Sequence, residues 1–221
     1  MSFLRIVRVL VPIVGAICAS TPDCAAAQAY NYPSLQLPTL STRDYTAAIV
    51  GPSGTVALFQ WRERVANNLH VSLDAGIADP QNNNLLIFAA GNLGRQLVRS
   101  SAEQPLDVLL TAGLGIGVGS SLTVLRIPIG ASAGHRFALD DGLALTPYVH
   151  PRISLDRCTS CGKRNNTNSE LSLNFDLGVN FDINENFAVR LAGLFSGSEL
   201  LGKSGAFAIG IAWTPAAIKA H

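Results

Sequence analysis

Residues 171–183 read LSLNFDLGVNFDI, and apolar and polar or small side chains alternate along them without a break. Because successive side chains of a strand point to opposite faces, the pattern predicts one apolar face and one polar face. A strand of 13 residues tilted by about 40° rises roughly 33 Å, which is enough to cross a bilayer. The stretch therefore predicts a membrane-spanning β-strand.

Nine further segments carry strand patterns of the same kind. They span residues 45–50, 55–64, 69–77, 85–93, 106–118, 125–133, 143–155, 187–195 and 207–213. Ten strands predict an all-β protein, an antiparallel up-and-down transmembrane β-barrel, for which an even strand number is the norm. Eight strands are the alternative, if the two weak N-terminal strands do not cross the membrane.

The N-terminus has the form of a secretory signal peptide. Arg5 and Arg8 flank an apolar stretch, and Ala27-Gln28-Ala29 offers a cleavage site before Tyr30. The expected organisation is a signal peptide at residues 1–29, an extended segment at 30–43, the barrel at 44–214 and a tail at 215–221. The extended segment is expected either to form a periplasmic tail or to tuck into the lumen.

Composition agrees with a barrel that faces lipid. Only 14% of residues are charged and 48% are hydrophobic, whereas about 25% are charged in typical soluble domains. The chain after the signal peptide is neutral, so no basic patch suggests nucleic acid. After the N-terminal stretch, no segment approaches the length of a spanning helix, which leaves strands to cross the membrane.

Irregular positions and connections are also predicted. Leu122 and Val124 are out of phase with the strand that follows, which predicts a bulge near Val124. Pro128, Pro147 and Pro151 predict bulges or rim positions, since proline lacks a ladder donor. Connections are expected on the periplasmic side at 65–68, 98–104, 140–142 and 184–186, and outside at 79–84, 157–169 and 197–205.

Aromatic residues lie near the predicted strand ends, where headgroup-level girdles form. The candidates for this girdle are Tyr45, Trp61, Phe187, Phe195, Phe207 and Trp213. The alternative is that they form the core of a soluble β-protein.

From residue 44 to 214 the chain resembles small bacterial outer-membrane β-barrel proteins. Its last strand, with Phe207, Ile209, Ile211 and Trp213 alternating, is similar to their final-strand assembly signal, although eight residues follow Trp213 here. The resemblance implies a Gram-negative-type outer membrane, contact with its lipid and lipopolysaccharide, and recognition by the barrel assembly machinery. It implies no specific activity. We expect a monomer without cofactor, metal or nucleic acid.

Charged residues on the polar faces are the candidate lumen residues. They are Arg62, Asp74, Asp107, Arg126, Arg152, Asp156, Asp176, Asp182 and Arg190. Such charges either pair and close the lumen or line a narrow water-filled pore. Barrels of about eight strands have interiors just filled by side chains, and ten strands give a slightly wider one.

Two histidines and two cysteines are the remaining candidates for chemistry. His70 and His150 are predicted to face inward, but Ser154 lies roughly 13 Å along the strand from His150, too far for a nucleophile and its base.

Cys158 and Cys161, in a predicted outer loop, favour a disulfide in an oxidising compartment. A redox pair or a zinc site would need a helix N-terminus or further ligands. We therefore expect no catalytic residue.

The sequence predicts a structural or loop-presenting outer-membrane barrel without enzymatic activity, whose outer loops would carry any binding. A narrow ion or small-solute pore is the alternative. Two further possibilities are an outer-membrane lipid-modifying enzyme and a soluble secreted ligand-binding barrel, and the latter would place the apolar faces inside.

Overall fold

A computed structural model describes residues 34–40, 42–51, 55–79, 85–120, 122–139, 142–161, 166–201 and 204–215. The predicted signal peptide, the tail beyond Pro215 and most of the predicted loop at 79–84 lie outside these residues. Within them, no helix is long and apolar enough to cross a membrane.

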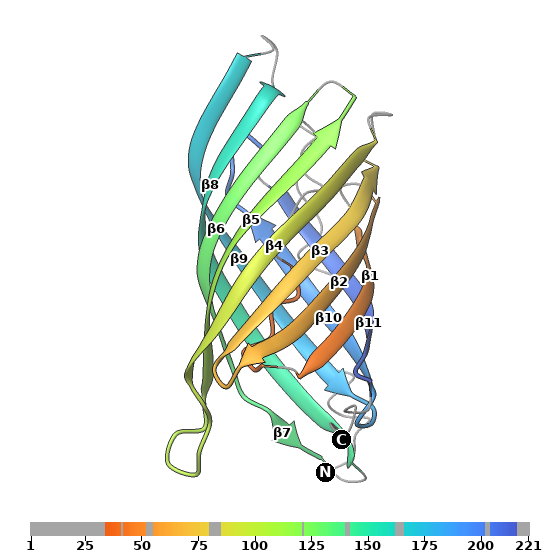
Figure 1. Ribbon diagram of the computed structural model, residues 1–221, viewed down its shortest axis with the longest axis vertical. Coiled ribbons are helices and arrows are strands. Elements are labelled where there is room, and N and C mark those ends of the chain that lie inside the picture. Colours follow the sequence, from red (N-terminus) through yellow and green to blue (C-terminus); the bar gives the residue numbers. More distant parts are fainter. Residues whose placement is uncertain are drawn as a thin grey trace.

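The described strands form one antiparallel sheet that closes on itself (Figure 1). They are β1 (Arg43–Gly51), β2 (Thr55–Ala66), β3 (Leu69–Asp79), β4 (Leu86–Val98), β5 (Asp107–Gly119), β6 (Thr123–Gly134), β7 (Phe137–Ala138), β8 (Ala144–Cys161), β9 (Asn166–Asp182), β10 (Phe187–Ser196) and β11 (Ser204–Trp213). β11 pairs with β1 and β6 pairs with β8, so ten strands close the barrel and β7 is a two-residue addition. The predicted ten-stranded barrel is confirmed.

The barrel carries its apolar side chains on the outside. On β9, Leu171, Leu173 and Leu177 are 70%, 68% and 53% exposed, whereas Asn174 and Asp176 between them are buried in the lumen. The other spanning strands repeat this arrangement, with exposed aliphatic residues on the outer face. The polarity is the opposite of that expected for a soluble ligand-binding barrel. A bilayer is the solvent that suits such a surface, because a closed barrel satisfies its backbone hydrogen bonds internally.

β8 and β9 are the longest strands, with 18 and 17 residues, and their hairpin rises beyond the rest of the wall (Figure 1). The prediction of an outer loop at residues 157–169 is therefore wrong, since strand structure continues to Cys161 and resumes at Asn166. Exposed side chains on this extension include Arg157, Thr159, Thr167 and Ser169. Above the apolar belt an outward side chain has no need to be apolar, so the alternation stops before the strand does. We call this end of the barrel the hairpin end.

The bulge predicted near Val124 is also wrong. β6 keeps one register with β5 from Thr123 to Gly134, and the Val124 side chain points into the lumen with no exposure. Strand pairing is interrupted around Pro128 and around Pro151 but resumes in the same register. Neither proline therefore causes a bulge. Pro147 lies where β8 leaves β6 and begins to pair with β7.

Inward glycines make room for large side chains of neighbouring strands. Gly178 on β9 lies opposite Tyr148 on β8, and a Cβ at Gly178 would lie 2.3 Å from the ring carbon Cζ. Gly94 on β4 accommodates the His70 ring in the same way, with 2.2 Å from such a Cβ to Nε2. These two glycines thus leave space on the inner wall for the rings of Tyr148 and His70.

The substitution Gly178→Ala is expected to lower the free energy of unfolding by about 1–3 kcal/mol, because the added methyl displaces the buried Tyr148 ring. Urea unfolding in detergent micelles measures the effect. Gly91→Ala is the matched control, since a Cβ at that outward position meets nothing nearer than 3.8 Å. Equal stability of the two variants would contradict the packing described for Tyr148.

Candidate functional site

The lumen is the candidate site, and the structure places most of the predicted charged residues in it. Exposed fractions are 2% or less for Arg62, Asp74, Arg126, Arg152, Asp156 and Asp176, 3% for Arg190 and 5% for Asp107. Asp107 lies at the end opposite the hairpin, where it accepts a hydrogen bond from the Ser100 backbone at 2.9 Å. Asp182 lies at the rim of that end and pairs with the half-exposed Arg136 at 3.2 Å.

Asp44 lies between two arginines in the first buried cluster. Arg190 Nη1 on β10 is 3.0 Å from Asp44 Oδ1, and Arg62 Nε on β2 is 3.6 Å from the same oxygen. Arg190 reaches Asp44 on β1 across β11, where it lies opposite Gly210. Asp44 was not among the predicted lumen residues because the predicted strand began one residue later.

A second cluster joins β5, β8 and β9. Arg152 forms an ion pair with Asp176, and His150 Nδ1 lies 3.4 Å from the same carboxylate. His150 Nε2 lies 2.9 Å from Thr111 Oγ1 on β5. Hydroxyl, imidazole and carboxylate thus follow one another in the order of an acyl-transfer triad. Thr111 was not predictable as a partner of His150, since β6 separates β5 from β8 in the sheet.

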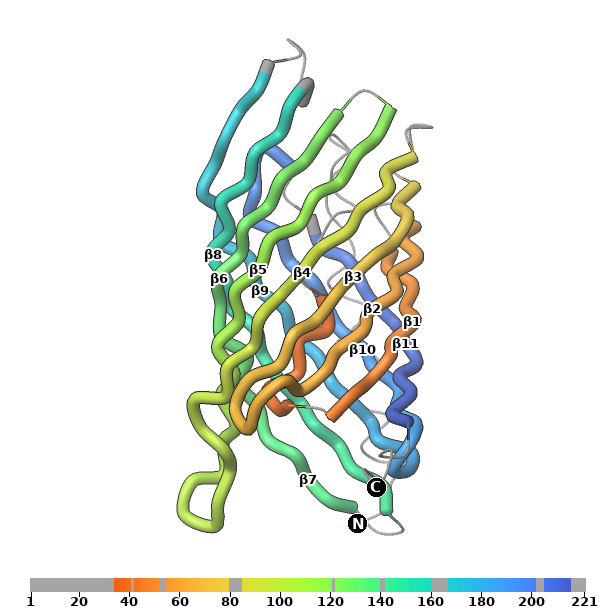
Figure 2. Tube along the Cα trace, viewed as in Figure 1, coloured from red at the N-terminus to blue at the C-terminus, as the bar shows by residue number. Residues whose placement is uncertain are grey.

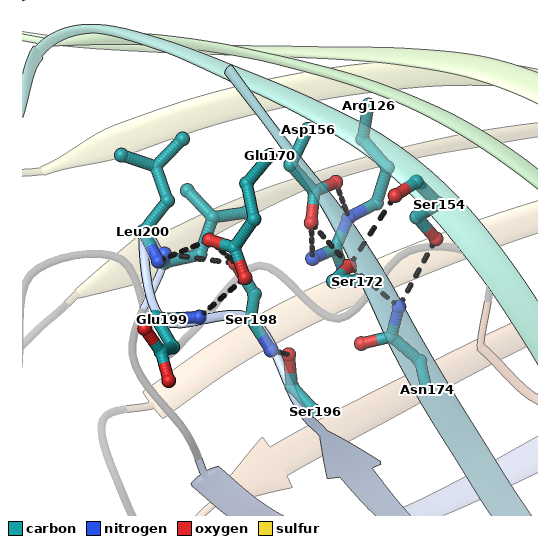
Figure 3. A network of polar contacts seen from close by, with 11 residues as sticks. Arg126, Ser154, Asp156, Glu170, Ser172, Asn174, Ser196, Ser198, Glu199 and Leu200 are labelled. Atoms are coloured by element: carbon teal, nitrogen blue, oxygen red, sulfur yellow. Dashed lines mark hydrogen bonds and ion pairs between the residues drawn. The ribbon is translucent and has the colours of Figure 1, made fainter. Parts of the chain in front are cut away.

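The third cluster is built around a bidentate ion pair (Figure 3). Arg126 Nε and Nη2 donate to the two carboxylate oxygens of Asp156 at 2.6 and 2.9 Å, and the two residues are directly opposite on β6 and β8. Ser172 Oγ also donates to Asp156 at 2.6 Å, and Asn174 donates to the hydroxyls of Ser154 and Ser172. Such charge-assisted, two-point contacts fix the relative positions of the strands.

Beside this cluster, Glu170 on β9 holds the described part of the β10–β11 connection (Figure 3). Its carboxylate accepts hydrogen bonds from the Glu199 and Leu200 backbone at 2.8 and 2.5 Å. Ser198 and Leu201 of this connection are buried, with 0% and 2% exposure. Glu170 was not among the predicted site residues because it lies between the predicted loop at 157–169 and the predicted strand at 171–183.

The substitution Glu170→Ala is expected to speed amide hydrogen exchange at Glu199 and Leu200 by roughly ten- to a hundred-fold, because hydrogen bonds to a charged group are lost. Hydrogen exchange followed by mass spectrometry measures this change. Amides of the β9–β10 turn, at the other end of the barrel, serve as an internal control. Unchanged exchange at the two loop amides would show that Glu170 does not hold the connection.

Towards the hairpin end, buried apolar side chains also pack in the lumen, beside the third charge cluster. This apolar cluster contains Leu35, Ala48, Val50, Val56, Leu58, Ala78, Leu86, Phe88, Ala90, Val124, Cys158, Ala192, Leu194, Leu201 and Ala208. A sequence signal for it exists, since residues 85–88 read LLIF and are apolar on both faces of the strand. Apart from Leu35 and Leu201, its members come from β1 to β4, β6, β8, β10 and β11, so the cluster packs across the lumen.

Residues 34–40 also occupy the lumen, so the described part of the predicted extended segment takes the second of its two expected placements (Figure 2). Leu35 and Gln36 are fully buried, and Leu35 belongs to the apolar cluster. Wall side chains donate to backbone carbonyls of the segment, among them Arg62 to Leu35 at 2.8 Å, Ser132 to Gln36 at 2.7 Å and Gln96 to Pro38 at 2.9 Å. The segment is therefore held inside the barrel by the wall.

The middle of the lumen is polar, and several of the buried side chains that the structure describes there lack a hydrogen-bond partner. Among the described residues, no hydrogen-bond partner is present for either ring nitrogen of His70, the Ser72 hydroxyl, the Tyr148 hydroxyl or Arg152 Nε. Buried polar groups are almost always hydrogen-bonded, and water supplies the partner where protein does not. This level of the lumen is therefore expected to be hydrated.

The predicted girdle residues lie on the outer face in two groups. Trp61, Tyr45, Trp213 and Phe187 are successive partners across β2, β1, β11 and β10, and the rings of Tyr45 and Trp213 stack with centroids 5.6 Å apart. Phe195 and Phe207 lie towards the hairpin end of β10 and β11. Two aromatic groups near opposite ends of an apolar belt are the arrangement expected at the two surfaces of a bilayer.

Cys158 is disulfide-bonded and its side chain is buried in the lumen. Both Cys158 and Cys161 lie on β8 rather than in the predicted loop, with an irregular register between them. The side chain of Cys161 lies outside the described part of the structure, so its pairing with Cys158 stays a prediction.

No protein-family profile matches the chain, and no curated protein matches it. Among solved structures, the β domain of the Bordetella autotransporter Brka aligns with a TM-score of 0.50 and 10% identity, over 78% of this chain and 98% of that one. The fold is that of a bacterial outer-membrane β-barrel. Two further matches are the KdgM porin (TM-score 0.43, 9% identity, 78% and 99% coverage) and Ail of Yersinia pestis in complex with a heparin analogue (0.32, 14%, 77% and 94%). At such low sequence identities, these matches bear on the fold alone.

Proposed function

We propose that this protein is a closed, loop-presenting barrel of the outer membrane of a Gram-negative-type bacterium, without enzymatic activity. The observation that carries the proposal is the filled lumen: residues 34–40 and the apolar cluster occupy the space through which a solute would pass. The three buried charge clusters lie along the wall and join strands to one another. Their role is structural, which is the first of the two alternatives that the sequence left open.

The outer surface supports the proposed location. An apolar belt bounded by aromatic rows suits a bilayer, and β11 ends at Trp213 with the alternation expected of a final-strand assembly signal. We include in the proposal export by a cleaved signal peptide, recognition by the barrel assembly machinery, contact with lipid and lipopolysaccharide, and a monomeric state. The β8–β9 hairpin, which rises above the wall, is the proposed surface for ligands or surface partners.

Conductance across a planar lipid bilayer tests whether the barrel is closed. The detergent-folded protein is expected to insert without producing steady openings, with a known porin measured in the same bilayer as the positive control. Steady single-channel openings of the wild type, changed in size by Arg152→Ala, would contradict the closed barrel.

A narrow pore is the second candidate function. The observation that favours it is the set of buried polar groups around His70, Ser72 and Tyr148, which suits a hydrated passage at mid-lumen. A pore would also require the apolar cluster to open, because this cluster packs across the lumen. Swelling of protein-containing liposomes in isotonic solutions of small sugars or amino acids would favour this candidate.

The Thr111, His150 and Asp176 arrangement does not favour an enzyme. Thr111 lies in the middle of β5, paired on both sides to β4 and β6, and its side chain is 2% exposed. Asp176 is also engaged by Arg152, which competes with the histidine for the carboxylate. Cells overexpressing the wild type or Thr111→Val are expected to have the same lipid A and phospholipid profiles. A change in the wild-type profile that Thr111→Val abolishes would overturn this part of the proposal.

A further inference from the structure

The contacts between the wall and residues 34–40 are directed mainly at the backbone of the segment. Carbonyls of Ser34, Leu35, Gln36 and Pro38 each accept a hydrogen bond from an inward side chain of the wall. The donors, in the same order, are Gln60 and Arg62 on β2, Ser132 on β6 and Gln96 on β4. The side chain of Gln36 adds one contact, since its Oε1 accepts from Asn92 on β4 at 3.2 Å. Three strands therefore present matched donors to one short segment.

The conformation of the segment is set by these contacts rather than by its own preference. Leu35 has φ of 56°, in the left-handed region that L-residues other than glycine seldom adopt. Its side chain is fully buried in the apolar cluster, and its carbonyl accepts from Arg62. Burial and the wall donors together offset the cost of this backbone conformation.

The segment adds nothing to the strand pairing that closes the barrel. The closed sheet consists of β1 to β6 and β8 to β11, and residues 34–40 form none of its strands. The wall contacts to the segment are hydrogen bonds and apolar packing. Its release would leave the wall closed and its donors available.

We propose that the inward face of β2, β4 and β6 is a binding site for a polypeptide segment, occupied in cis by residues 34–40, which can be exchanged for the same segment supplied in trans. The inference goes beyond the proposed function, since it makes the filling of the lumen reversible. The ligand is defined chemically: a short peptide whose backbone carbonyls meet the wall donors and whose leucine at the position of Leu35 enters the apolar cluster.

The test uses the full-length variant Leu35→Arg and a fluorescent peptide with the sequence of residues 33–42, PSLQLPTLST. Arginine at this position meets the apolar cluster and the positive charge of Arg62, so the cis segment is expelled while the wall stays intact. Fluorescence anisotropy in detergent micelles is expected to show peptide binding at least about tenfold tighter than to the wild type, whose cis segment competes at high effective concentration.

Wall variants show whether binding uses the proposed donors. Adding Asn92→Leu and Ser132→Ala to Leu35→Arg removes both contacts to Gln36, and the affinity for the peptide is expected to fall on the order of 30-fold. Adding Ser72→Ala instead is the matched control. Ser72 is a similarly buried inward serine on β3 without a hydrogen bond to the segment, and its loss is expected to leave the affinity unchanged.

Heat-dependent gel mobility first establishes that each variant is folded. A folded Leu35→Arg variant that binds no peptide would overturn the proposal, whatever the conductance of the wild type. If Leu35→Arg does not fold, the variant Gln36→Cys replaces it. Its labelling by a water-soluble maleimide is expected to be slow and to accelerate at least about tenfold when excess unlabelled peptide displaces the segment. A labelling rate that the peptide leaves unchanged would equally overturn the proposal.

Discussion

The substitution Arg126→Ala is expected to lower the free energy of unfolding by about 3–5 kcal/mol, because it leaves the Asp156 carboxylate buried without its partner. Both side chains have no exposure, and the guanidinium contacts both carboxylate oxygens. Ser172 would remain as a donor to Asp156, but one hydroxyl does not compensate for a lost guanidinium. Urea unfolding in detergent micelles, followed by tryptophan fluorescence, measures the loss.

The double substitution Arg126→Met with Asp156→Leu is the control for this prediction. It removes both charges and replaces them with apolar side chains of similar size, so most of the lost stability is expected to return. A loss below 1 kcal/mol in Arg126→Ala alone would mean that water reaches the pair and that the lumen is open at this level.

The substitution Leu177→Arg is expected to cost about 2–4 kcal/mol, since it places a charge at the middle of the lipid-facing surface. Leu177 is 53% exposed on the outer face of β9, where it lies opposite Val149 on β8 and Gly193 on β10. The comparison with Leu171→Arg isolates the effect of depth. Leu171 is 70% exposed on the same face of the same strand, but it lies in the part of β9 that extends beyond its pairing with β10.

Leu171→Arg is expected to cost no more than about 1 kcal/mol, because charges near the membrane surface are tolerated. Unfolding free energies in lipid vesicles provide the comparison. In a soluble barrel both leucines would face water, and both substitutions would change stability by less than about 0.5 kcal/mol. Equal, small effects at the two positions would therefore contradict a membrane location.

The strands of the barrel were predictable because the bilayer imposes a period of two on them. Each of the ten predicted segments lies largely within an observed strand, and the prediction was wrong where that constraint ends. The extension of β8 to Cys161 and the start of β9 at Asn166 lie above the apolar belt, where polar outward side chains hide the alternation. The bulge predicted at Pro128 was also wrong, because this proline interrupts pairing locally without changing the register.

The contents of the lumen were less predictable, because they depend on which strands meet across the sheet. Alternation placed Arg126 and Asp156 on inward faces, but only the register of β6 and β8 makes them a pair. Residues 34–40 have no periodic pattern, so their placement follows from wall donors such as Arg62 and Ser132 that sequence alone does not bring together. Asp44 and Glu170 were missed because they lie at the edge of predicted elements.

We propose that the outer face of this barrel contacts lipid, and the native tryptophans provide the test of that claim. Trp61 and Trp213 are the two tryptophans of the chain, and both lie in the aromatic row on the outer face. Their fluorescence should be quenched in vesicles of lipids brominated on the acyl chains. Bromines near the headgroup should quench more strongly than bromines near the chain ends. Fluorescence equal to that in unbrominated vesicles, with the protein folded, would contradict the claim.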